Sequence, residues 1–380
     1  MKNRPELLHI EEPSLEFRFG QRATYPRDGL YLFGPSDAGA VPRSIRYGFI
    51  GTPESLVCFQ EWASQVSKFI PVPPRGRAAK GNAPHHVPFP GFAEAYFAHW
   101  SNKPACVIND LSEGDLRQKA HIGNRHEAIK ELVDTYVDRL IAETRRLEDP
   151  PHFWYLVIPE FVYELGRPQS TVSKLDRVPG KILLSEKQAN KMAYQSSLFA
   201  QDEKDAKVYQ YEKNFRRQLK ARLLDHKVVT QIVRETTLAP NRFLKAGTDQ
   251  PKRRVEDPAT IAWKLATGSY YKAGGRPWQL AGVRPGVCYV GLVYKQQPQG
   301  EDQRYACCAA QMFLADGEGV VFRGALGPWY NPKTKQYHLD AEAAHRLATT
   351  VIAEYRSKHG RDPSELFIHA QSRFDDDEWA

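Results

Sequence analysis

The feature that most constrains the fold is the run FWYLVIPE (153–160), which is apolar almost throughout. A continuous apolar run of strand length is typical of a parallel strand that helices cover on both faces. Before it, residues 124–147 carry apolar side chains at helical spacing, and an Asp-Pro-Pro sequence ends the predicted helix. Strands that alternate with long helices predict a doubly wound, Rossmann-like α/β region up to about residue 285.

The segments upstream predict further units of the same kind. RYGFIG (46–51) reads as a buried strand, and Thr52 is a plausible N-cap with Pro53 at the first helical position, which predicts a helix through about Val66. ACVIND is the next predicted strand. The first forty residues are predicted to alternate short strands and turns, in SLEFRFG and PRDGLYLFGP.

After residue 285 the pattern changes. Strands are predicted over 287–295 and 304–315, and the turn DGEG (316–319) joins the second of these to VVFRG as a hairpin. Asp340 can cap a helix that runs to Gly360, and ELFIHA follows as a strand. Three strands, a helix and a strand are the opening order of the ribonuclease H fold. Because the sequence ends soon afterwards, we expect this second domain to be incomplete at its C-terminus.

Composition narrows the classes of function. The net charge of +8 and the pI of about 9.1 favour a polyanionic partner. Basic residues crowd at 204–227 and at 251–257, whereas the chain ends in the acidic FDDDEWA. No apolar run approaches the length of a membrane span, and the N-terminus is polar. We therefore predict a cytoplasmic protein that does not enter a membrane.

The sequence gives little support for a bound metal or a nucleotide cofactor. The five cysteines are an odd number and form no CxxC, so we predict a reduced protein without a structural metal. His85 and His86 lie in a Pro/Gly-rich loop (73–91) and are predicted to be solvent residues rather than ligands. Neither a G-x-G-x-x-G nor a P-loop is present, which leaves a dinucleotide cofactor unsupported.

The densest candidate site is NFRRQLKARLLDHKVVTQIVRETTL (214–238). Arg216 and Lys220 are four residues apart and share a helix face, where like charges repel and an anion would offset the repulsion. Phosphate suits this pair, because arginine offers a bidentate fork and lysine a point charge. A solvated basic face is the alternative. TQIVRE then predicts a strand that carries Gln231, an amide donor to a phosphate oxygen or a base edge.

Lys272 stands in YYKAGGRPW (270–278) and has two interpretations. The segment from Asp257 reads as a helix that Gly274 and Gly275 end, and a lysine in the last turn is favoured there by the helix dipole. In the second interpretation Lys272 is a further cation of the phosphate site. Spacing alone leaves both open.

These motifs together resemble a known family. The order R-x-x-x-K, then Q in a following strand, then K-A-G-G at a helix end is similar to the 5′-phosphate pocket in the MID domain of Argonaute proteins. The stretch after it resembles the start of their PIWI domain. Further phrases are similar to the short prokaryotic Argonautes, which lack a PAZ domain: EEPSLEFRFG, RDGLYLFGP, PFPGF, QLKARLLDHKVVTQIVRETTL, YYKAGGRPW, RPGVCYVGLVYK, GPWYNP and FIHAQSRF.

The resemblance implies a domain plan and a site. Residues 1–285 would form an N-terminal segment plus a Rossmann-like MID domain, and 286–380 the first part of an RNase H-like PIWI domain. It places Arg216, Lys220, Gln231 and Lys272 around the 5′-phosphate of a guide, with Mg²⁺ bridging the first and third guide phosphates. Relatives often have tyrosine or histidine at the position of Arg216, so the preferred 5′ nucleotide is left open.

The resemblance also implies that target cleavage is absent. Cleaving members hold two metal ions with carboxylates, one in the first PIWI strand and one at the end of the strand after the helix. Here Val293 stands at the first position, and His369 to Gln371 stand at the second. Asp375 to Asp377 come too late and look like the start of a helix. We expect no catalytic residues in this chain.

The function that follows is recognition. A guide RNA would direct the chain to invading single-stranded DNA, and a TIR-APAZ protein, bound as a heterodimer that assembles further on activation, would hydrolyse NAD. RPGVCYVGLVYK, ACCAAQMF and GPWYNP suggest this subtype, the SPARTA systems. The alternatives are a sirtuin-like or nuclease APAZ partner, a guide-directed nuclease, and a basic Rossmann protein that acts on a small molecule.

Overall fold

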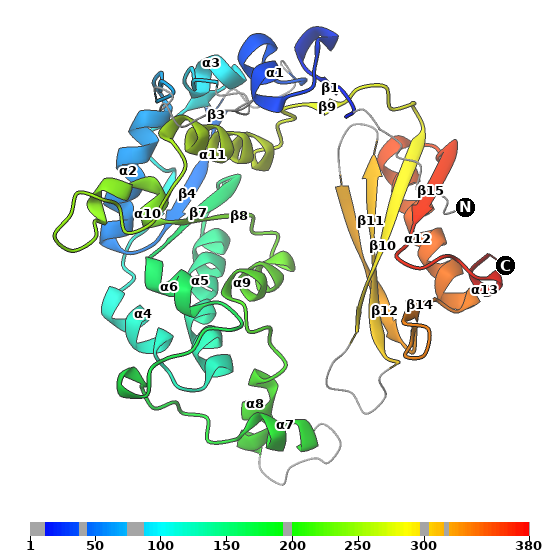
Figure 1. Ribbon diagram of the computed structural model, residues 1–380. Coiled ribbons are helices and arrows are strands. Elements are labelled where there is room, and N and C mark those ends of the chain that lie inside the picture. Colours follow the sequence, from blue (N-terminus) through cyan, green and yellow to red (C-terminus); the bar gives the residue numbers. More distant parts are fainter. Residues whose placement is uncertain are drawn as a thin grey trace, which may run out of the picture. The chain divides into compact units, whose positions relative to one another are not determined.

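The computed structural model describes residues 12–37, 44–73, 87–192, 200–296, 304–314 and 319–379 (Figure 1). The chain forms two compact units. One runs from Leu30 to Pro277, and the other joins the residues up to Gly29 with those from Trp278 onward. The predicted mixed α/β class is confirmed. The predicted division into a 1–285 domain and a 286–380 domain, with the function of each, stays a prediction.

The 30–277 unit is built on a four-stranded parallel sheet, which confirms the Rossmann-like prediction. The strand order is β6-β4-β7-β8, and each neighbouring pair is parallel. The strands are β4 (Tyr47–Ile50), β6 (Cys106–Ile108), β7 (Phe153–Ile158) and β8 (Thr230–Arg234). Central strand β7 is buried at every residue, as its continuous apolar sequence predicted.

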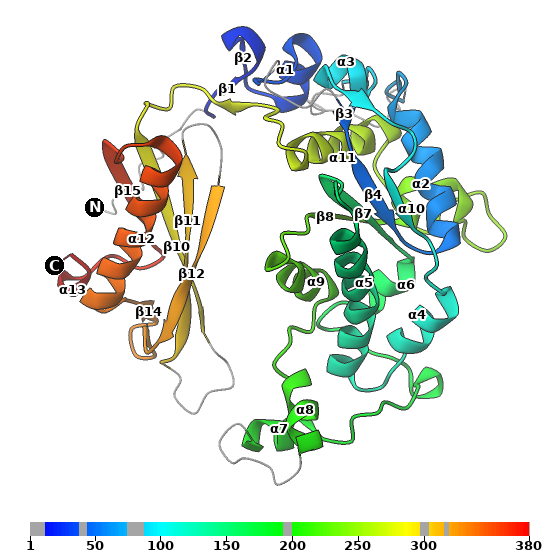
Figure 2. The same cartoon turned by 180° about the vertical axis from the view of Figure 1, so that it is seen from behind.

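Helices cover both faces of this sheet (Figures 1 and 2). Trp154 and Leu156 of β7 pack in one core with α5 (Arg125–Arg146) and α9 (Phe215–Leu224). Tyr155 points to the other face, where its ring meets Phe59 and Trp62 of α2 (Pro53–Val66). The Tyr155 hydroxyl also hydrogen-bonds that of Ser269 in α11 (Pro258–Lys272), at 2.5 Å. Alternation along one strand therefore fixes α9 and α11 on opposite faces.

Three helix starts in this unit follow from their capping residues. Thr52 accepts a hydrogen bond from the Ser55 amide at 3.1 Å and begins α2. Asn124 caps α5, and Asp257 accepts from the Thr260 amide at 2.9 Å at the start of α11. Such side chains satisfy amides that the first helical turn leaves without partners. The predicted helices over 53–66, 124–147 and from Asp257 are confirmed.

Shorter elements complete the unit. The two-residue strands β3 (Ser44–Ile45) and β5 (His99–Trp100) pair in parallel. The remaining helices are α3 (Phe92–Tyr96), α4 (Glu113–Ala120), α6 (Glu160–Leu165), α7 (Glu186–Met192), α8 (Ala200–Val208) and α10 (Glu235–Leu238). In the part of the chain that the structure describes, no helix is both long and apolar enough to cross a membrane.

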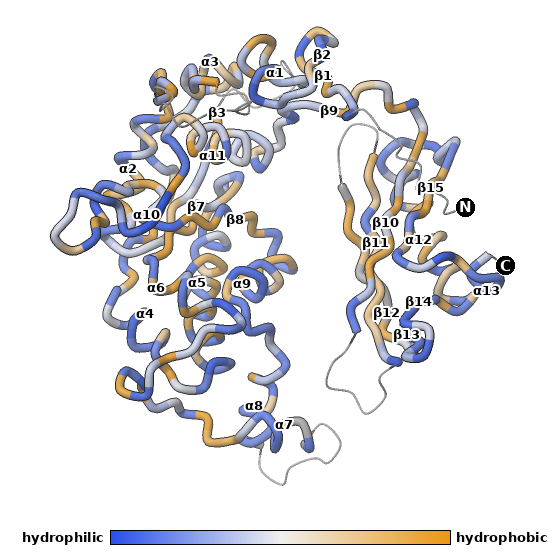
Figure 3. Tube along the Cα trace, viewed as in Figure 1, coloured by the Kyte–Doolittle hydropathy of each residue, from blue (hydrophilic) through white to orange (hydrophobic). Residues whose placement is uncertain are grey.

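The second unit carries the sheet order β12-β11-β10-β15, which confirms the predicted RNase H-like opening. Strand β11 pairs antiparallel with both β10 and β12, whereas β15 returns parallel to β10 after helix α12. Figure 3 shows β10 and β11 mainly in the hydrophobic colours. The elements are β10 (Val287–Gln296), β11 (Ala306–Leu314), β12 (Gly319–Gly327), α12 (Ala341–His359) and β15 (Glu365–His369). Residues 316–318 of the predicted turn lie outside the described residues.

Helix α12 covers one face of this sheet. Asp340 caps it as predicted, accepting from the Ala343 amide at 2.7 Å, and Gly360 ends it with a φ of +69°. Val351 and Tyr355 pack against buried residues of β10 and β11. Smaller elements are β1 (Leu15–Glu16), β2 (Arg22–Ala23), β9 (Gln279–Leu280), β13 (Tyr330–Asn331), β14 (Gln336–Tyr337) and α13 (Asp376–Trp379).

Two sequence-based expectations are wrong. PRDGLYLF folds as helix α1 (Pro26–Phe33) rather than as a strand, because Pro26 suits the first helical position and Asp28 its first turn. The four-residue spacing of Tyr211, Phe215, Leu219 and Leu223 predicts a single buried helical face. Helix α9 begins only at Phe215, since Asn214 caps it, so Tyr211 precedes the helix and is 38% exposed. His85 and His86 lie outside the described residues.

Candidate functional site

The four predicted site residues come from three elements of the 30–277 unit. Arg216 and Lys220 lie on α9, Gln231 on β8, and Lys272 is the last residue of α11. The Lys272 Nζ donates a hydrogen bond to the Gln231 Oε1 at 2.7 Å. Lys272 therefore does more than end a helix, because its ammonium group contacts a neighbouring strand.

The charges of Arg216 and Lys220 act on the lysine of this contact. The pKa of Lys272 is lowered to about 8, first by burial and then by the positive charges of Lys220 and Arg216. Lys220 is exposed as a residue, yet burial around its ammonium group lowers its pKa too, with Arg216 as the second cause. Each of these lysines is thus easier to deprotonate than an ordinary one. The positive charges of Arg216, Lys220 and Lys272 therefore act on one another, at a cost to the charged forms of the two lysines.

No carboxylate offsets these charges among the residues that the structure describes. Within that part of the chain, Arg216, Lys220 and Lys272 form no ion pair, although ion pairs are common elsewhere in the same unit. Arg222, on the same helix, pairs with Asp134. Uncompensated cations raise the local potential and favour an anionic ligand.

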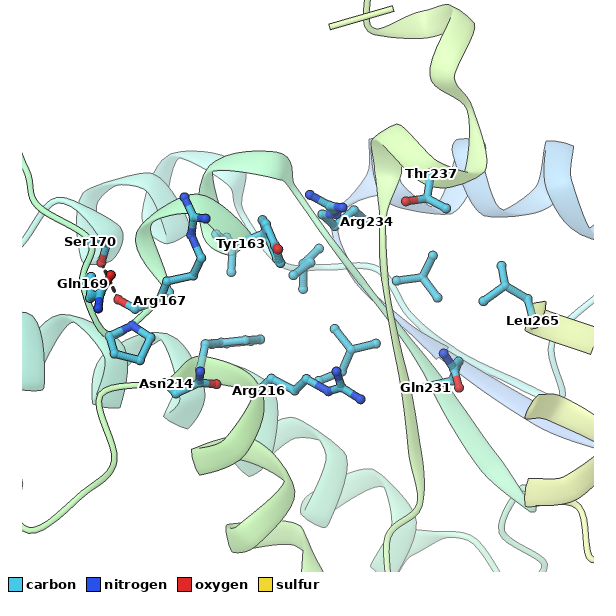
Figure 4. A pocket seen from close by; sticks show the side chains of 17 residues that line it. Tyr163, Arg167, Gln169, Ser170, Asn214, Arg216, Gln231, Arg234, Thr237 and Leu265 are labelled. Carbon is cyan, nitrogen blue, oxygen red and sulfur yellow. Dashed lines mark hydrogen bonds between the residues drawn. The ribbon is translucent and has the colours of Figure 1, made fainter. Parts of the chain in front are cut away.

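Beside the Lys272–Gln231 contact lies a pocket of about 870 Å³ (Figure 4). Arg216 and Gln231 line it, whereas Lys220 and Lys272 do not. Its other lining residues are Ile158, Val162, Tyr163, Gly166, Arg167, Pro168, Gln169, Ser170, Asn214, Phe215, Ile232, Val233, Arg234, Thr237 and Leu265. None of these side chains is acidic. The volume lies in the range of small-ligand sites and exceeds what one phosphate group fills.

Sequence reasoning missed one end of this pocket. Tyr163 belongs to α6 and Arg167 follows it, and the Arg234 guanidinium lies 3.9 Å from the centre of the Tyr163 ring. A signal was available: α6 begins directly after the buried parallel strand β7, and ligands of open α/β sheets bind beyond the carboxyl ends of such strands.

In the second unit, the positions expected to hold catalytic carboxylates lie on and after the sheet. Val293 is 59% exposed on β10, Gly291 pairs with His369 of β15, and Gln371 follows that strand. Asp375 precedes helix α13, which begins at Asp376, as the sequence predicted for these acids.

Within the described residues, one group of three side chains has metal-ligand chemistry: His338, Asp375 and Glu378. The His338 Nδ1 lies 3.0 Å from the Glu378 Oε2 and 3.3 Å from the Asp375 Oδ2. Glu378 also accepts a hydrogen bond from the Leu339 amide at 3.0 Å. The group includes neither Val293 nor Gln371, and its mutual contacts hold α13 against the start of α12.

Comparisons with known proteins give structural neighbours only. No family model matches the sequence, and no curated protein is similar to it. Aa-Ago with externally bound siRNA has a TM-score of 0.45 and 12% identity over 97% of this chain and 37% of its own. Drosophila Piwi has a TM-score of 0.40 and 12% identity over 95% and 34%. A. aeolicus Argonaute has a TM-score of 0.45 and 11% identity over 97% and 36%.

These neighbours are Argonaute and Piwi proteins, and the chain spans little more than a third of the length of each. At such identities and TM-scores, the likeness says nothing of what this chain binds.

Proposed function

We propose that this chain is a guide-directed recognition module of the short prokaryotic Argonaute kind. In this proposal it binds the 5′-phosphate of a short guide RNA and presents the guide to complementary single-stranded DNA. Sequence would be read by base pairing, and the protein would hold the duplex by its backbone. The motif order that resembles a MID and PIWI pair supports this proposal.

One observation carries the proposal: the Lys272–Gln231 contact, at 2.7 Å, beside two further cations without a carboxylate partner among the described residues. The pKa of Lys272 is lowered because burial and neighbouring charges disfavour its ammonium form. The negative charge of a phosphate dianion would favour the ammonium form of Lys272 and so oppose both effects on its pKa. Arg216 would hold it by a bidentate fork, and Gln231 would donate through its amide nitrogen.

We further propose Mg²⁺ at the guide 5′ end. The pocket lining offers no acidic side chain, and the Gln231 oxygen already accepts from Lys272. Mg²⁺ prefers oxygen ligands and often takes them from phosphates and water. The ion would therefore be held mainly by guide phosphates, whose charge it would neutralise.

Catalysis is proposed to belong to a partner. Val293 and Gln371 offer no carboxylate at the positions where target cleavage would need one. The partner we propose is a TIR-APAZ protein in prokaryotic immunity, which hydrolyses NAD once target DNA pairs with the guide and the heterodimers assemble. A sirtuin-like or nuclease APAZ partner is the alternative, and a nuclease activity of this chain is a weaker one.

The test reconstitutes the system in two arms. In the first, the purified chain is titrated with one RNA sequence that carries either a 5′-phosphate or a 5′-hydroxyl, with and without magnesium. In the second, the chain and its co-encoded partner receive guide, complementary DNA, magnesium and NAD. We expect a preference for the 5′-phosphate, and NAD loss only with both proteins and a matched target.

The two arms fail separately. Equal affinity for the two RNA ends would refute the phosphate site. Loss of the target DNA strand with this chain alone would refute the assignment of catalysis to a partner. NAD loss that does not depend on the target would refute activation by pairing, because a ligand shifts an equilibrium only through different affinities for its two states.

A further inference from the structure

Lys272 has the surroundings of a nucleophile as well as those of a phosphate ligand. Its Nζ donates to the Gln231 Oε1 at 2.7 Å, and burial, followed by the charges of Lys220 and Arg216, lowers its pKa to about 8. An ordinary lysine has a pKa of about 10.4, so near pH 7.5 the neutral amine is about two hundredfold more abundant at Lys272. Because one N–H points at Gln231, the lone pair of that amine is directed away from it.

Space for a reactant lies beside this amine. Gly268 is one turn before Lys272 on α11, and both residues are half-buried. Apart from the helix backbone and its chain neighbours, a Cβ at Gly268 would come within 4 Å of two atoms of the described residues. These are the Gln231 Oε1 at 3.5 Å and the Lys272 Nζ at 3.7 Å. The missing side chain therefore leaves room next to the nitrogen for a group the size of a methyl.

The other side of the contact faces groups that suit an anion. Gln231 and Arg216 line the same pocket, and Figure 4 shows both side chains at one end of it. Within the described part of the chain, neither Arg216 nor Lys220 has a carboxylate partner. A small molecule with a phosphate at one end and an electrophilic carbon at the other fits these surroundings, because each end meets the chemistry that it needs.

Resting on the proposed phosphate site, we propose that Lys272 is an acylation site whose acyl donor is a small acyl phosphate. The donor's phosphate would lie toward Arg216 and Gln231, and its carbonyl carbon beside the Lys272 Nζ. The nitrogen lone pair forms a bond to that carbon, the bond from the carbon to the phosphate oxygen breaks, and the phosphate leaves with the bonding electrons. The nitrogen gives one proton to the departing phosphate, so the products are an amide and hydrogen phosphate. Arg216 and Lys220 stabilise the negative charge that grows on the phosphate.

Acylation would weaken the phosphate site. The amide formed at Lys272 carries no charge, so the site loses one of its three cations, and the acyl group fills the space beside Gly268. Affinity for a 5′-phosphorylated RNA should then fall by about ten- to a hundredfold, the loss expected for one hydrogen bond to a charged group. A 5′-hydroxyl RNA should bind nearly as before. Guide binding would thereby depend on the concentration of acyl phosphate.

The test compares two acetyl donors, with mass spectrometry of the full chain as the readout. Acetyl phosphate carries a phosphate group, whereas the N-hydroxysuccinimide ester of acetic acid does not. Lys264 is the internal control, because it lies two turns earlier on α11, is exposed and pairs with Glu256 at 2.6 Å. With acetyl phosphate, Lys272 should be acetylated at least about tenfold faster than Lys264, since its gain in neutral amine exceeds the loss of nucleophilicity in a weaker base. Inorganic phosphate and a 5′-phosphorylated RNA should slow this reaction, and a 5′-hydroxyl RNA should slow it less.

Two variants separate the phosphate contact from the reactivity of the amine. Arg216→Ala relieves the repulsion that lowers the Lys272 pKa, which slows both donors alike, but it removes a phosphate contact only for acetyl phosphate. Acetylation of Lys272 by acetyl phosphate should therefore fall at least about tenfold further than acetylation by the ester. Lys272→Arg cannot be acetylated at this position and keeps its charge. After treatment with acetyl phosphate it should retain the preference for a 5′-phosphate that treated wild type loses.

The outcomes separate this inference from the proposed function. If Lys272 is acetylated no faster than Lys264 while wild type prefers a 5′-phosphate, the inference fails and the proposed function stands. If Arg216→Ala slows both donors equally, or if Lys220 is acetylated in place of Lys272, the phosphate does not present the acyl group to Lys272 and the inference fails. If wild type ignores the 5′-phosphate, the proposed function fails and this inference fails with it. Thermal unfolding shows whether each variant keeps its fold, and protection by inorganic phosphate is measured on wild type alone.

Discussion

Two arginines on helix α9 have opposite surroundings. Arg222 contacts Asp134, which also pairs with Lys130 at 2.6 Å, so its charge is compensated within the fold. Arg216, on the same helix, has no carboxylate partner among the described residues and instead lowers the pKa values of Lys220 and Lys272. On this one helix, Arg222 forms an ion pair with α5, whereas Arg216 and Lys220 repel each other.

This difference in carboxylate partners distinguishes cations that stabilise the fold from cations that are available to bind an anionic ligand. A charge held near like charges and partly removed from water costs free energy in the empty protein. Such an arrangement at a pocket is more common at functional sites than elsewhere, although ion-pair networks also shift pKa values. Substitutions on either side of this comparison should therefore separate ligand affinity from stability.

The largest expected effect is that of Arg216→Ala combined with Lys220→Ala. Hydrogen bonds to charged groups contribute about 1.5–3 kcal/mol each, so the double variant should lose at least about a hundredfold in affinity for a 5′-phosphorylated RNA. Affinity for the 5′-hydroxyl RNA should change far less. Titration of both RNAs by fluorescence anisotropy measures this. Unchanged discrimination in the double variant would show that these two cations do not bind the phosphate.

Arg222→Ala is the control on the compensated side. Removing one partner of a half-buried pair should lower the free energy of unfolding by about 1–2 kcal/mol, which urea denaturation measures. Discrimination between the two RNA ends should stay at the wild-type level. If Arg222→Ala lost this discrimination with its fold intact, any positive charge on α9 would contribute to phosphate binding. The contrast between Arg216 and Arg222 would then not hold.

The next effect is a pH dependence that belongs to Lys272. With a pKa of about 8 in the empty pocket, Lys272 is charged below that pH and neutral above it. A bound phosphate, already dianionic above about pH 6, would raise this pKa, so binding takes up a proton above pH 8. Affinity for the 5′-phosphorylated RNA should therefore fall as pH rises from 8 to 9.5, by up to about tenfold per pH unit.

Lys272→Arg tests the origin of this slope. An arginine stays charged throughout the range, so the variant should bind phosphate with a nearly flat pH profile between 8 and 9.5. The 5′-hydroxyl RNA serves as the reference for pH effects on the rest of the interface. A slope that persists in the variant would assign the titration to another group.

The parts of this comparison that the sequence predicts are those with local signals. The four-residue spacing puts Arg216 and Lys220 on the same helix face, and Asp257 predicts where α11 begins. The apolar run FWYLVIPE, among strands that alternate with helices, predicts the parallel sheet. The site residues on α9, β8 and α11 come together only through pairings between strands that are distant in the sequence, and no local pattern encodes those pairings. The position of Tyr163 in the helix that follows the buried strand β7 is a local signal for the edge of the sheet, whereas its contact with Arg234 forms only when β8 lies beside β7.

The smallest effect is expected at Gly268, on the last turns of α11. A Cβ there would lie 3.5 Å from the Gln231 Oε1 and 3.7 Å from the Lys272 Nζ, which is ordinary contact without a clash. Alanine inside a helix is favoured over glycine, so Gly268→Ala should raise the free energy of unfolding by about 0.5–1 kcal/mol. The added methyl would cover the side of the Lys272–Gln231 contact that faces it, and we expect phosphate affinity to fall a few-fold. Stability and affinity should therefore move in opposite directions, as urea denaturation and RNA titration on the same preparation can measure. If stability and affinity rise together, the phosphate does not bind on the side of the Lys272–Gln231 contact that faces Gly268. It then binds only on the side that faces Arg216.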